Sequence, residues 1–331
     1  MRRDSTLRLS IAADEPVRNH CAPQRRVAAR FVWVLALKIA VVAIASASGC
    51  TSFGRKSVPE NVVAARQLSL RGMDALQRGR CDEAESLFGQ AIETCPVNDR
   101  AHAGYAETLW QRGDREKAVS HMEHALRLSG GDPEMLVQLG EMHLARGELD
   151  AAAHRAEQAI QSQRQLAPAW VLKGDVQRQR GQFAEALASY HRALAYQEPY
   201  PRAQMALADV YRQQSLPQRA LATLDSLADH YAPADVPAGV RLQQGLAQQA
   251  LGRYDDAVES LLAATRTGPA KPDVLVHLGE AQLLAGDLSN ARLTLAQALR
   301  QAPQHAAALQ LAARVEGQQQ RMAAATEPTT R

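Results

Sequence analysis

A short segment recurs along the chain at a nearly constant interval, and this periodicity constrains the fold more than any other feature. Each copy carries a turn residue inside a motif such as LQRGRCDEA at 76–84 or WQRGDREKA at 110–118. The spacings between turn residues are 34, 34, 34, 34, 37 and 34, and the residues are Gly79, Gly113, Gly147, Gly181, Ser215, Gly252 and Gly286. A period of about 20–50 residues is typical of solenoids, in which each unit buries its apolar face against its neighbours.

Each unit is predicted to form two helices joined at the turn residue, because apolar residues recur at i, i+3, i+4 and i+7 on both sides. Alanine stands five positions after the turn in all seven units, and glycine or alanine stands seven positions before it. Small side chains let two helices cross closely, so these two rows are predicted to mark the contact within each pair. Larger residues nine positions after the turn, such as Phe88 and Tyr190, are predicted to fill the space between pairs.

This combination of period, turn residue and small-residue rows resembles the tetratricopeptide repeat over residues 65–305. The resemblance implies an all-α fold: a right-handed α-solenoid of about seven helix pairs. We assign repeats 1–5 to residues 65–237, repeats 6–7 with a capping helix to 238–317, and a disordered tail to 318–331. The longer spacing before repeat six falls near Pro233 and Pro237, where we expect a kink.

The first fifty residues carry a targeting signal of their own. Seven arginines precede an apolar run over 31–45, which is shorter than the ~20 residues of a membrane-spanning helix and is interrupted by Lys38. Small residues and then Cys50 follow. These features favour a signal peptide at 1–49 over a permanent anchor, although an ordinary signal peptide and an uncleaved signal anchor remain alternatives.

The stretch SASGC, ending at Cys50, resembles a bacterial lipobox, with Ala47 in place of the usual leucine. The resemblance implies that Cys50 is acylated and that residues 50–64 form a tether. It also implies a lipoprotein of the cell envelope that faces the periplasm, and Thr51 after the cysteine favours the outer membrane. Loss of residues 1–49 would remove a net charge of +5 and change the chain from +3 to about −2, so the basic balance gives no reason to expect nucleic-acid binding.

No sequence motif for catalysis or cofactor binding is present. The chain lacks a phosphate loop, a GxGxxG motif, HExxH and paired CxxC motifs, so we expect no enzyme activity, no cofactor and no metal site. His121 and His124 lie three residues apart on one helix, but two ligands without a third are weak evidence, and we interpret them as solvent-side residues. Cys81 and Cys95 lie about 21 Å apart along a helix and should not form a disulfide.

In the repeat family the first helix of each pair lines a concave groove, and positions ten, six and three before the turn share one face of that helix. The position-six row is acidic in four consecutive repeats, which would place Glu107, Glu141, Asp175 and Asp209 in a line. The remaining candidate groove residues, three positions before the turn, are Leu76, Trp110, Leu144, Arg178 and Arg212. The alternative is that Asp175 with Arg178, and Asp209 with Arg212, neutralise each other as i, i+3 pairs.

Taken with the resemblances, these features predict a membrane-anchored, non-catalytic scaffold that binds protein or peptide partners of the bacterial envelope through its groove. Two alternatives remain open. One is an accessory factor for pilus or exopolysaccharide export and assembly. The other is a signal-anchored, uncleaved protein with the same binding role.

Overall fold

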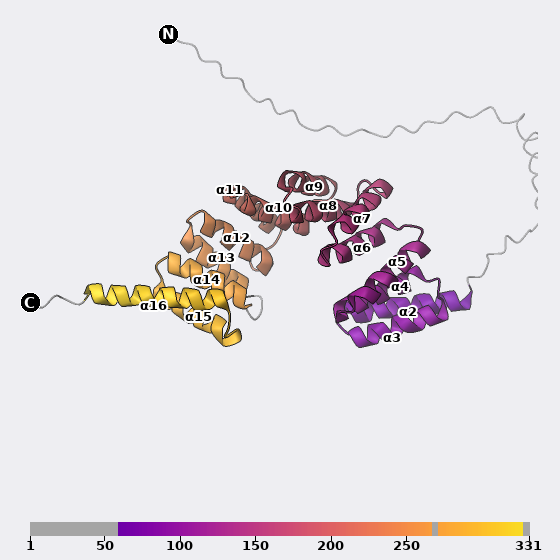
Figure 1. The fold of residues 1–331 in the computed structure, drawn as a ribbon, viewed down its shortest axis with the longest axis horizontal. Helices are drawn as coiled ribbons and strands as arrows, with labels where there is room; N and C mark the ends of the chain where they lie inside the picture. Colours follow the sequence, from indigo (N-terminus) through magenta and orange to yellow (C-terminus); the bar gives the residue numbers. More distant parts are fainter. Residues whose placement is uncertain (1–58, 267–270, 327–331) are drawn as a thin grey trace, which may run out of the picture. The chain divides into compact units, whose positions relative to one another are not determined.

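The computed structural model describes residues 59–266 and 271–326, and these segments contain fifteen helices and no strand (Figure 1). The predictions for residues 1–49, Cys50 and most of the tether lie outside the described residues. The helices are α2 (Glu60–Gln77), α3 (Cys81–Thr94), α4 (Asp99–Arg112), α5 (Arg115–Leu128), α6 (Pro133–Ala145), α7 (Leu149–Ser162), α8 (Ala167–Gln179), α9 (Phe183–Tyr196), α10 (Pro201–Gln213), α11 (Pro217–Ala228), α12 (Ala238–Ala250), α13 (Tyr254–Thr265), α14 (Pro272–Leu284), α15 (Leu288–Gln301) and α16 (Ala306–Thr326).

The helices form seven consecutive pairs, α2–α3 through α14–α15, followed by α16, so the expected all-α stack of helix pairs is confirmed. Glycine ends most first helices because the turn needs a left-handed backbone. Gly113 has a φ of 91°, and its N–H bonds back to the carbonyls of Leu109 and Trp110. Ser215 adopts the same backbone hand in repeat five, with a φ of 58°.

Glycines seven positions before the turn, such as Gly72 and Gly174, mark close contacts within their pairs, as predicted. A Cβ atom on Gly72 would lie 2.9 Å from the Phe88 ring, and one on Gly174 would lie 2.6 Å from the Tyr190 ring. Phe88 and Tyr190 belong to the row of larger residues nine positions after the turn, so that row packs inside its own pair. Phe88 also packs against Gly104 of the next pair and therefore fills both spaces.

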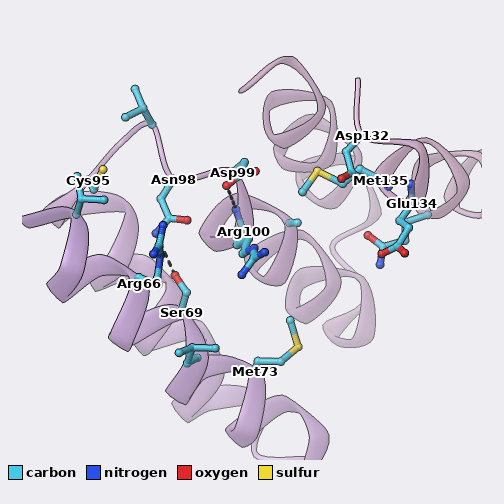
Figure 2. A pocket seen from close by; sticks show the side chains of 15 residues that line it. Arg66, Ser69, Met73, Cys95, Asn98, Asp99, Arg100, Asp132, Glu134 and Met135 are labelled. Atoms are coloured by element: carbon cyan, nitrogen blue, oxygen red, sulfur yellow. Dashed lines mark hydrogen bonds between the residues drawn. The ribbon is translucent and has the colours of Figure 1, made fainter. Parts of the chain in front are cut away.

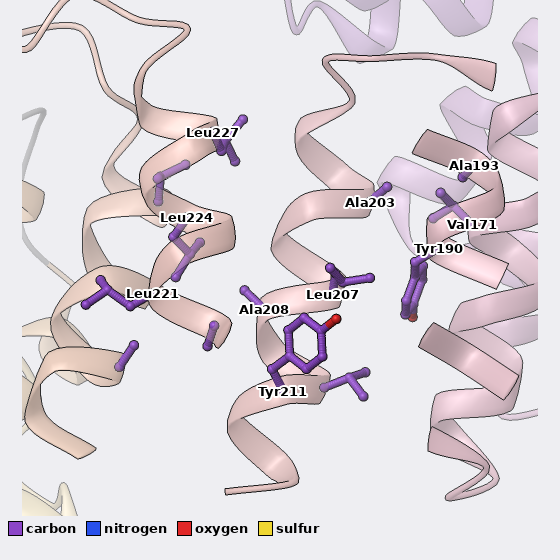
Figure 3. Close-up of a cluster of buried hydrophobic side chains, with 14 of the residues drawn as sticks. Val171, Tyr190, Ala193, Ala203, Leu207, Ala208, Tyr211, Leu221, Leu224 and Leu227 are labelled. Carbon is purple, nitrogen blue, oxygen red and sulfur yellow. The ribbon is translucent and has the colours of Figure 1, made fainter. Parts of the chain in front are cut away.

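A continuous apolar cluster joins repeats four to six across the predicted kink (Figure 3). Tyr190, Leu207 and Leu224 come from successive helices of this cluster and are almost fully buried. Val236 lies in the connection between α11 and α12 and is buried in the same cluster. Because α12 contacts both α10 and α11, the stack continues through the three-residue insertion.

The first helices of neighbouring pairs contact one another, as α6–α8 and α8–α10 do, whereas each second helix packs on the next first helix. The first helices are therefore closer together from pair to pair and line the inner face. Helices α4 and α6 are less closely packed than the other successive first helices. This local separation opens the groove described below.

Both ends of the described stack are more helical than the sequence indicated. Helix α2 begins at Glu60, so the last residues of the expected tether are helical. Helix α16 continues past Gly317 to Thr326, through much of the expected tail. The glutamines, alanines and Met322 of this stretch are good helix formers, and no proline occurs before Pro328. Among the described helices, none combines the length and apolar character needed to cross a membrane.

Candidate functional site

A groove of about 820 Å³ lies between the first helices of repeats one to three (Figure 2). Helix α2 contributes Leu70 and Met73, the turn before α4 contributes Val97, and α6 contributes Met135. Leu70 and Val97 are 61% and 70% exposed, which is unusual for apolar residues that lie side by side in one depression. The groove therefore presents apolar surface that the fold itself does not cover.

Hydrogen bonds fix the rim of this groove. The Ser69 hydroxyl donates to the carbonyl of Ala65 at 2.8 Å and accepts from the Asn98 amide at 3.3 Å. Asn98 in turn caps α4 by accepting the N–H of Ala101 at 3.1 Å. Asp132 caps α6 in the same way. The groove is thus built on secured helix ends and not on mobile side chains.

Two arginines also line the groove, Arg66 on α2 and Arg100 on α4 (Figure 2). Both are exposed, and neither guanidinium has an ion-pair partner within residues 59–266 and 271–326. Sequence reasoning missed both because it considered only positions ten, six and three before the turn. The groove therefore combines apolar surface with two guanidinium groups that are free to donate hydrogen bonds to a carboxylate of another molecule.

The predicted acidic row is largely neutralised from within the stack. Asp175 is buried, and its carboxylate accepts hydrogen bonds from the Tyr190 hydroxyl at 2.7 Å and from Arg202 at 3.1 Å. Arg202 also pairs with Glu141. Burial lowers the pKa of Arg202, but Glu141 and Asp175 outweigh this effect and raise it. Arg202 was not among the groove residues predicted from the sequence, although it pairs with two of them, Glu141 and Asp175.

The fourth acid of the row, Asp209, is also paired. It accepts from Arg212 at 2.8 Å and from Gln213 at 2.7 Å, and Arg178 lies 3.6 Å away. The i, i+3 pair expected between Asp209 and Arg212 is thus present. Asp175 takes Tyr190 and Arg202 as its hydrogen-bond donors instead of Arg178, because α9 and α10 bring these groups over it.

Glu107 is the one acid of the row without an ion-pair partner in the described part of the chain. It is half-buried, and burial raises its pKa. Trp110 lies one turn further along α4, half-buried, with the Arg115 guanidinium 5.5 Å from its ring centre. Leu144 is half-buried, whereas Leu76 is 5% exposed and belongs to the core. Among the groove residues predicted from the sequence, Glu107 therefore keeps a carboxylate without an ion-pair partner in the described part of the chain, and Trp110 keeps a partly accessible ring.

The repeat architecture matches that of a known protein family. The tetratricopeptide repeat profile matches residues 69–133, 108–169, 171–235 and 242–306, which together cover more than half of the chain. The chain belongs to the tetratricopeptide repeat family. Proteins of this family typically act as non-catalytic scaffolds that bind protein or peptide partners on extended surfaces.

Individual relatives agree on the fold. The tetratricopeptide repeat protein 36 of Danio rerio is 36% identical over 73 residues, a match that spans 22% of this chain and 39% of that protein. A solved tetratricopeptide repeat protein from Parabacteroides merdae has a TM-score of 0.58 at 14% identity, covering 76% of this chain and 99% of that one. The structure of pilF from Pseudomonas aeruginosa has a TM-score of 0.56 at 19% identity, covering 68% and 99%. These structural likenesses show the shared fold.

One histidine cluster of the tetratricopeptide repeats was only partly foreseen. His102 on α4 joins His121 and His124, with ring centres 5.4 Å and 4.4 Å away. The Nε2 of His102 lies 3.1 Å from the carbonyl of Pro96, so Nε2 carries the proton and Nδ1 accepts from His121 Nδ1, also at 3.1 Å. Burial lowers the pKa of both His102 and His121. His121 is thus a half-buried group packed against His102 and not a solvent-side one.

Within residues 59–266 and 271–326, no three His, Cys, Asp or Glu side chains are arranged to hold a metal ion. Cys81 and Cys95 are both free, as their predicted separation requires.

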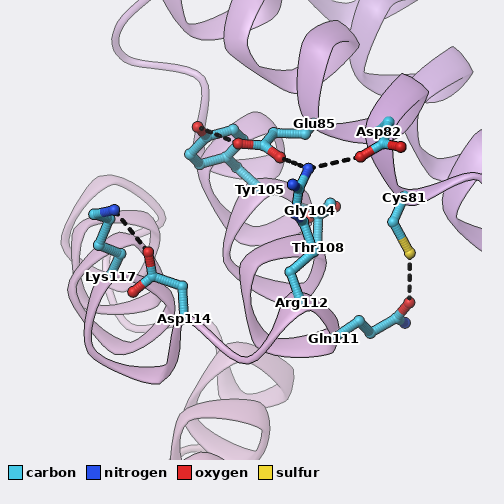
Figure 4. Close-up of polar contacts among 10 residues, drawn as sticks. All are labelled: Cys81, Asp82, Glu85, Gly104, Tyr105, Thr108, Gln111, Arg112, Asp114 and Lys117. Atoms are coloured by element: carbon cyan, nitrogen blue, oxygen red, sulfur yellow. Dashed lines mark hydrogen bonds and ion pairs between the residues drawn. The ribbon is translucent and has the colours of Figure 1, made fainter.

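The other polar contacts near the tetratricopeptide groove join neighbouring pairs. Arg112 of α4 reaches back to α3, where it pairs with Asp82 at 2.9 Å and with Glu85 (Figure 4). The Tyr105 hydroxyl approaches Glu85 at 3.5 Å. These exposed ion pairs fix α4 on α3, whereas Asp99, Arg100 and Ala103 of α4 line the groove.

Proposed function

We propose that this protein is a non-catalytic scaffold that binds partner proteins of the bacterial cell envelope through its first helices. The observation that carries the proposal is the surface of α2, α4 and α6. Its groove keeps exposed apolar side chains and two arginines without ion-pair partners among the described residues. The unpaired Glu107 lies further along α4, outside the lining of that groove, in a row whose other three acids are paired. Groups that a fold leaves exposed and unpaired in one groove are the usual signature of a partner site.

Site-specific photo-crosslinking in cells tests this proposal. A p-benzoylphenylalanine at Met73 lies in the groove, and one at Leu293 serves as the matched control. Leu293 is 62% exposed on the second helix α15, compared with 36% for Met73, so the control position is at least as accessible as the groove position. We expect discrete protein adducts from position 73 and none from position 293.

Equal adducts at both positions would contradict binding through the first helices. Adducts with pilus subunits or with components of a polysaccharide export channel would favour the second function, an accessory role in export or assembly.

The membrane anchor is the second part of the proposal. Its support is the apolar run over 31–45 followed by small residues and Cys50. Radiolabelled palmitate should enter the full-length protein and should be absent from Cys50→Ala. The mass of the mature N-terminus separates this result from an uncleaved signal anchor, which would retain residues 1–49 and would not be labelled at Cys50.

A further inference from the structure

The three arginines Arg66, Arg100 and Arg202 occupy one repeat position, thirteen residues before the turn residue of their units. Arg202 shows what an arginine at this position does. Its guanidinium binds Asp175 at 3.1 Å and also pairs with Glu141. Both acids stand six positions before the turn, in the two repeats that precede Arg202. The position therefore directs a guanidinium backwards along the inner face, toward the acidic row.

The same register leaves Arg100 and Arg66 without acceptors. One repeat before Arg100, the position that holds Asp175 in the Arg202 arrangement holds Met73. For Arg66, which lies in the first repeat, the described stack has no preceding pair. Both side chains line the groove, where Met73 also lies (Figure 2). Repeats one and two thus each carry an arginine at the position of Arg202, but they lack the carboxylates that bind Arg202.

The charges of the groove differ between its two sides. On the α2 and α4 side, Asp99 already accepts the backbone N–H of Arg100. On the α6 side, Asp132 accepts two backbone N–H groups, and Glu134 is exposed. The carboxylates of Asp99, Asp132 and Glu134 therefore line the groove together with Arg66 and Arg100, and the two guanidinium groups are its cations beside Leu70, Met73 and Val97.

We propose that this groove binds an acidic, leucine-rich segment of a partner protein, with carboxylates on Arg66 and Arg100 and an apolar side chain on Leu70, Met73 and Val97. The inference rests on the proposed scaffold function and names the chemistry of its partner. The partner's carboxylates occupy the place that Asp175 and Glu141 occupy before Arg202.

A fluorescein-labelled twelve-residue peptide of alternating Glu-Glu and Leu-Leu pairs provides the probe, read by anisotropy with the full-length protein. Two control peptides replace every Glu by Lys or every Leu by Ser. We expect the Glu-Leu peptide to bind at least about tenfold more tightly than either control, and to weaken as salt is raised. Equal binding of the Lys-Leu peptide would overturn the inference.

Variants locate the contact. Arg66→Gln combined with Arg100→Gln should weaken the Glu-Leu peptide by about tenfold, as expected for the loss of charge-assisted contacts. Arg71→Gln is the matched control, because Arg71 is an exposed arginine of the same helix α2 that does not line the groove. If the double variant binds as the wild type does, or if Arg71→Gln weakens binding equally, the inference fails.

Met73 allows a test of the register itself. Met73→Asp supplies the internal carboxylate that the repeat position lacks, whereas the isosteric Met73→Asn supplies none. We expect the aspartate variant to bind the Glu-Leu peptide more weakly than the asparagine variant, and equal affinities would contradict the Arg202 analogy. Cross-links from position 73 in cells without binding of the Glu-Leu peptide would leave the scaffold function standing and refute this inference alone.

Discussion

Gly174→Ala should destabilise the protein even though alanine is the better helix former. A methyl group at this position would lie 2.6 Å from Cε1 and 2.8 Å from Cδ1 of Tyr190, and that ring is fully buried. The ring cannot swing aside, because its hydroxyl donates to Asp175 at 2.7 Å (Figure 3 shows Tyr190 in its cluster). Overpacking costs about 1–3 kcal/mol, and the helix gains about 0.5–1 kcal/mol from the loss of glycine, so the net loss lies between about 0 and 2.5 kcal/mol, and we expect the upper half of this range because the ring is fully buried.

Gly89→Ala is the matched control. Gly89 lies inside α3, and a Cβ atom there would meet nothing within 4 Å. Only the helix preference changes, so the free energy of unfolding of this variant should rise by about 0.5–1 kcal/mol. The two substitutions are chemically identical and are predicted to have opposite signs.

Urea denaturation followed by circular dichroism measures both variants, and hydrogen exchange in α8 and α9 localises the effect. The local measurement is needed because a long repeat array does not have to unfold in a single step. A Gly174→Ala variant as stable as Gly89→Ala would refute the packing argument. Tyr190→Phe added to Gly174→Ala should reduce the penalty by freeing the ring, and an unchanged penalty would show that the hydroxyl does not hold it.

Three further predictions concern stability. Arg202→Gln leaves the buried Asp175 with fewer hydrogen-bond donors and should lower the free energy of unfolding by about 1–2 kcal/mol in urea denaturation. The loss is smaller than for a fully buried ion pair because Arg202 is partly exposed. Adding Asp175→Asn should restore part of the loss. Because burial lowers the pKa of His102 and His121, the folded state binds fewer protons than the unfolded state, and the unfolding free energy should fall as pH drops below about 6.5; His121→Gln should flatten this dependence. Ser215→Gly should raise the unfolding free energy by about 0.5–1 kcal/mol, since it relieves a left-handed serine, and an unchanged denaturation midpoint would contradict this.

The helix pairs were predictable because their signals are local. Turn residues, small-residue rows and apolar spacing each act within one unit, and the close approach at Gly174 follows from them, although Tyr190 was expected between pairs and packs inside its own pair. The ends of the stack were less predictable, because α16 continues past Gly317 with no stop signal, and Gln319 still donates to the carbonyl of Leu288 at 3.5 Å. These differences concern where the helices begin and end and leave the helix pairs unchanged.

The site was less predictable because its decisive contacts cross repeats. Glu141 and Asp175 were identified on the correct face, but Arg202, which neutralises them, lies 61 and 27 residues away in the chain. A search within single helices favours i, i+3 partners and finds Arg212 for Asp209, but it does not find a side chain that reaches over from the next pair. His102 was missed for the same reason, since it joins His121 from a different helix.

The direction of these contacts explains why the first repeats are the part left open for a partner. An arginine thirteen positions before the turn reaches back to acids of earlier repeats, so a donor in repeat one or two has few or no acceptors behind it. At the other end the same position holds Asp273, which contacts His305 of α16 at 2.9 Å. Backward pairing therefore satisfies Arg202 in repeat five, whereas the arginines at the same position in repeats one and two have no ion-pair partner among the described residues. If Arg66 and Arg100 serve only solubility, Arg66→Gln with Arg100→Gln will change neither peptide binding nor the cross-links from Met73, and the pairing rule will have no bearing on function.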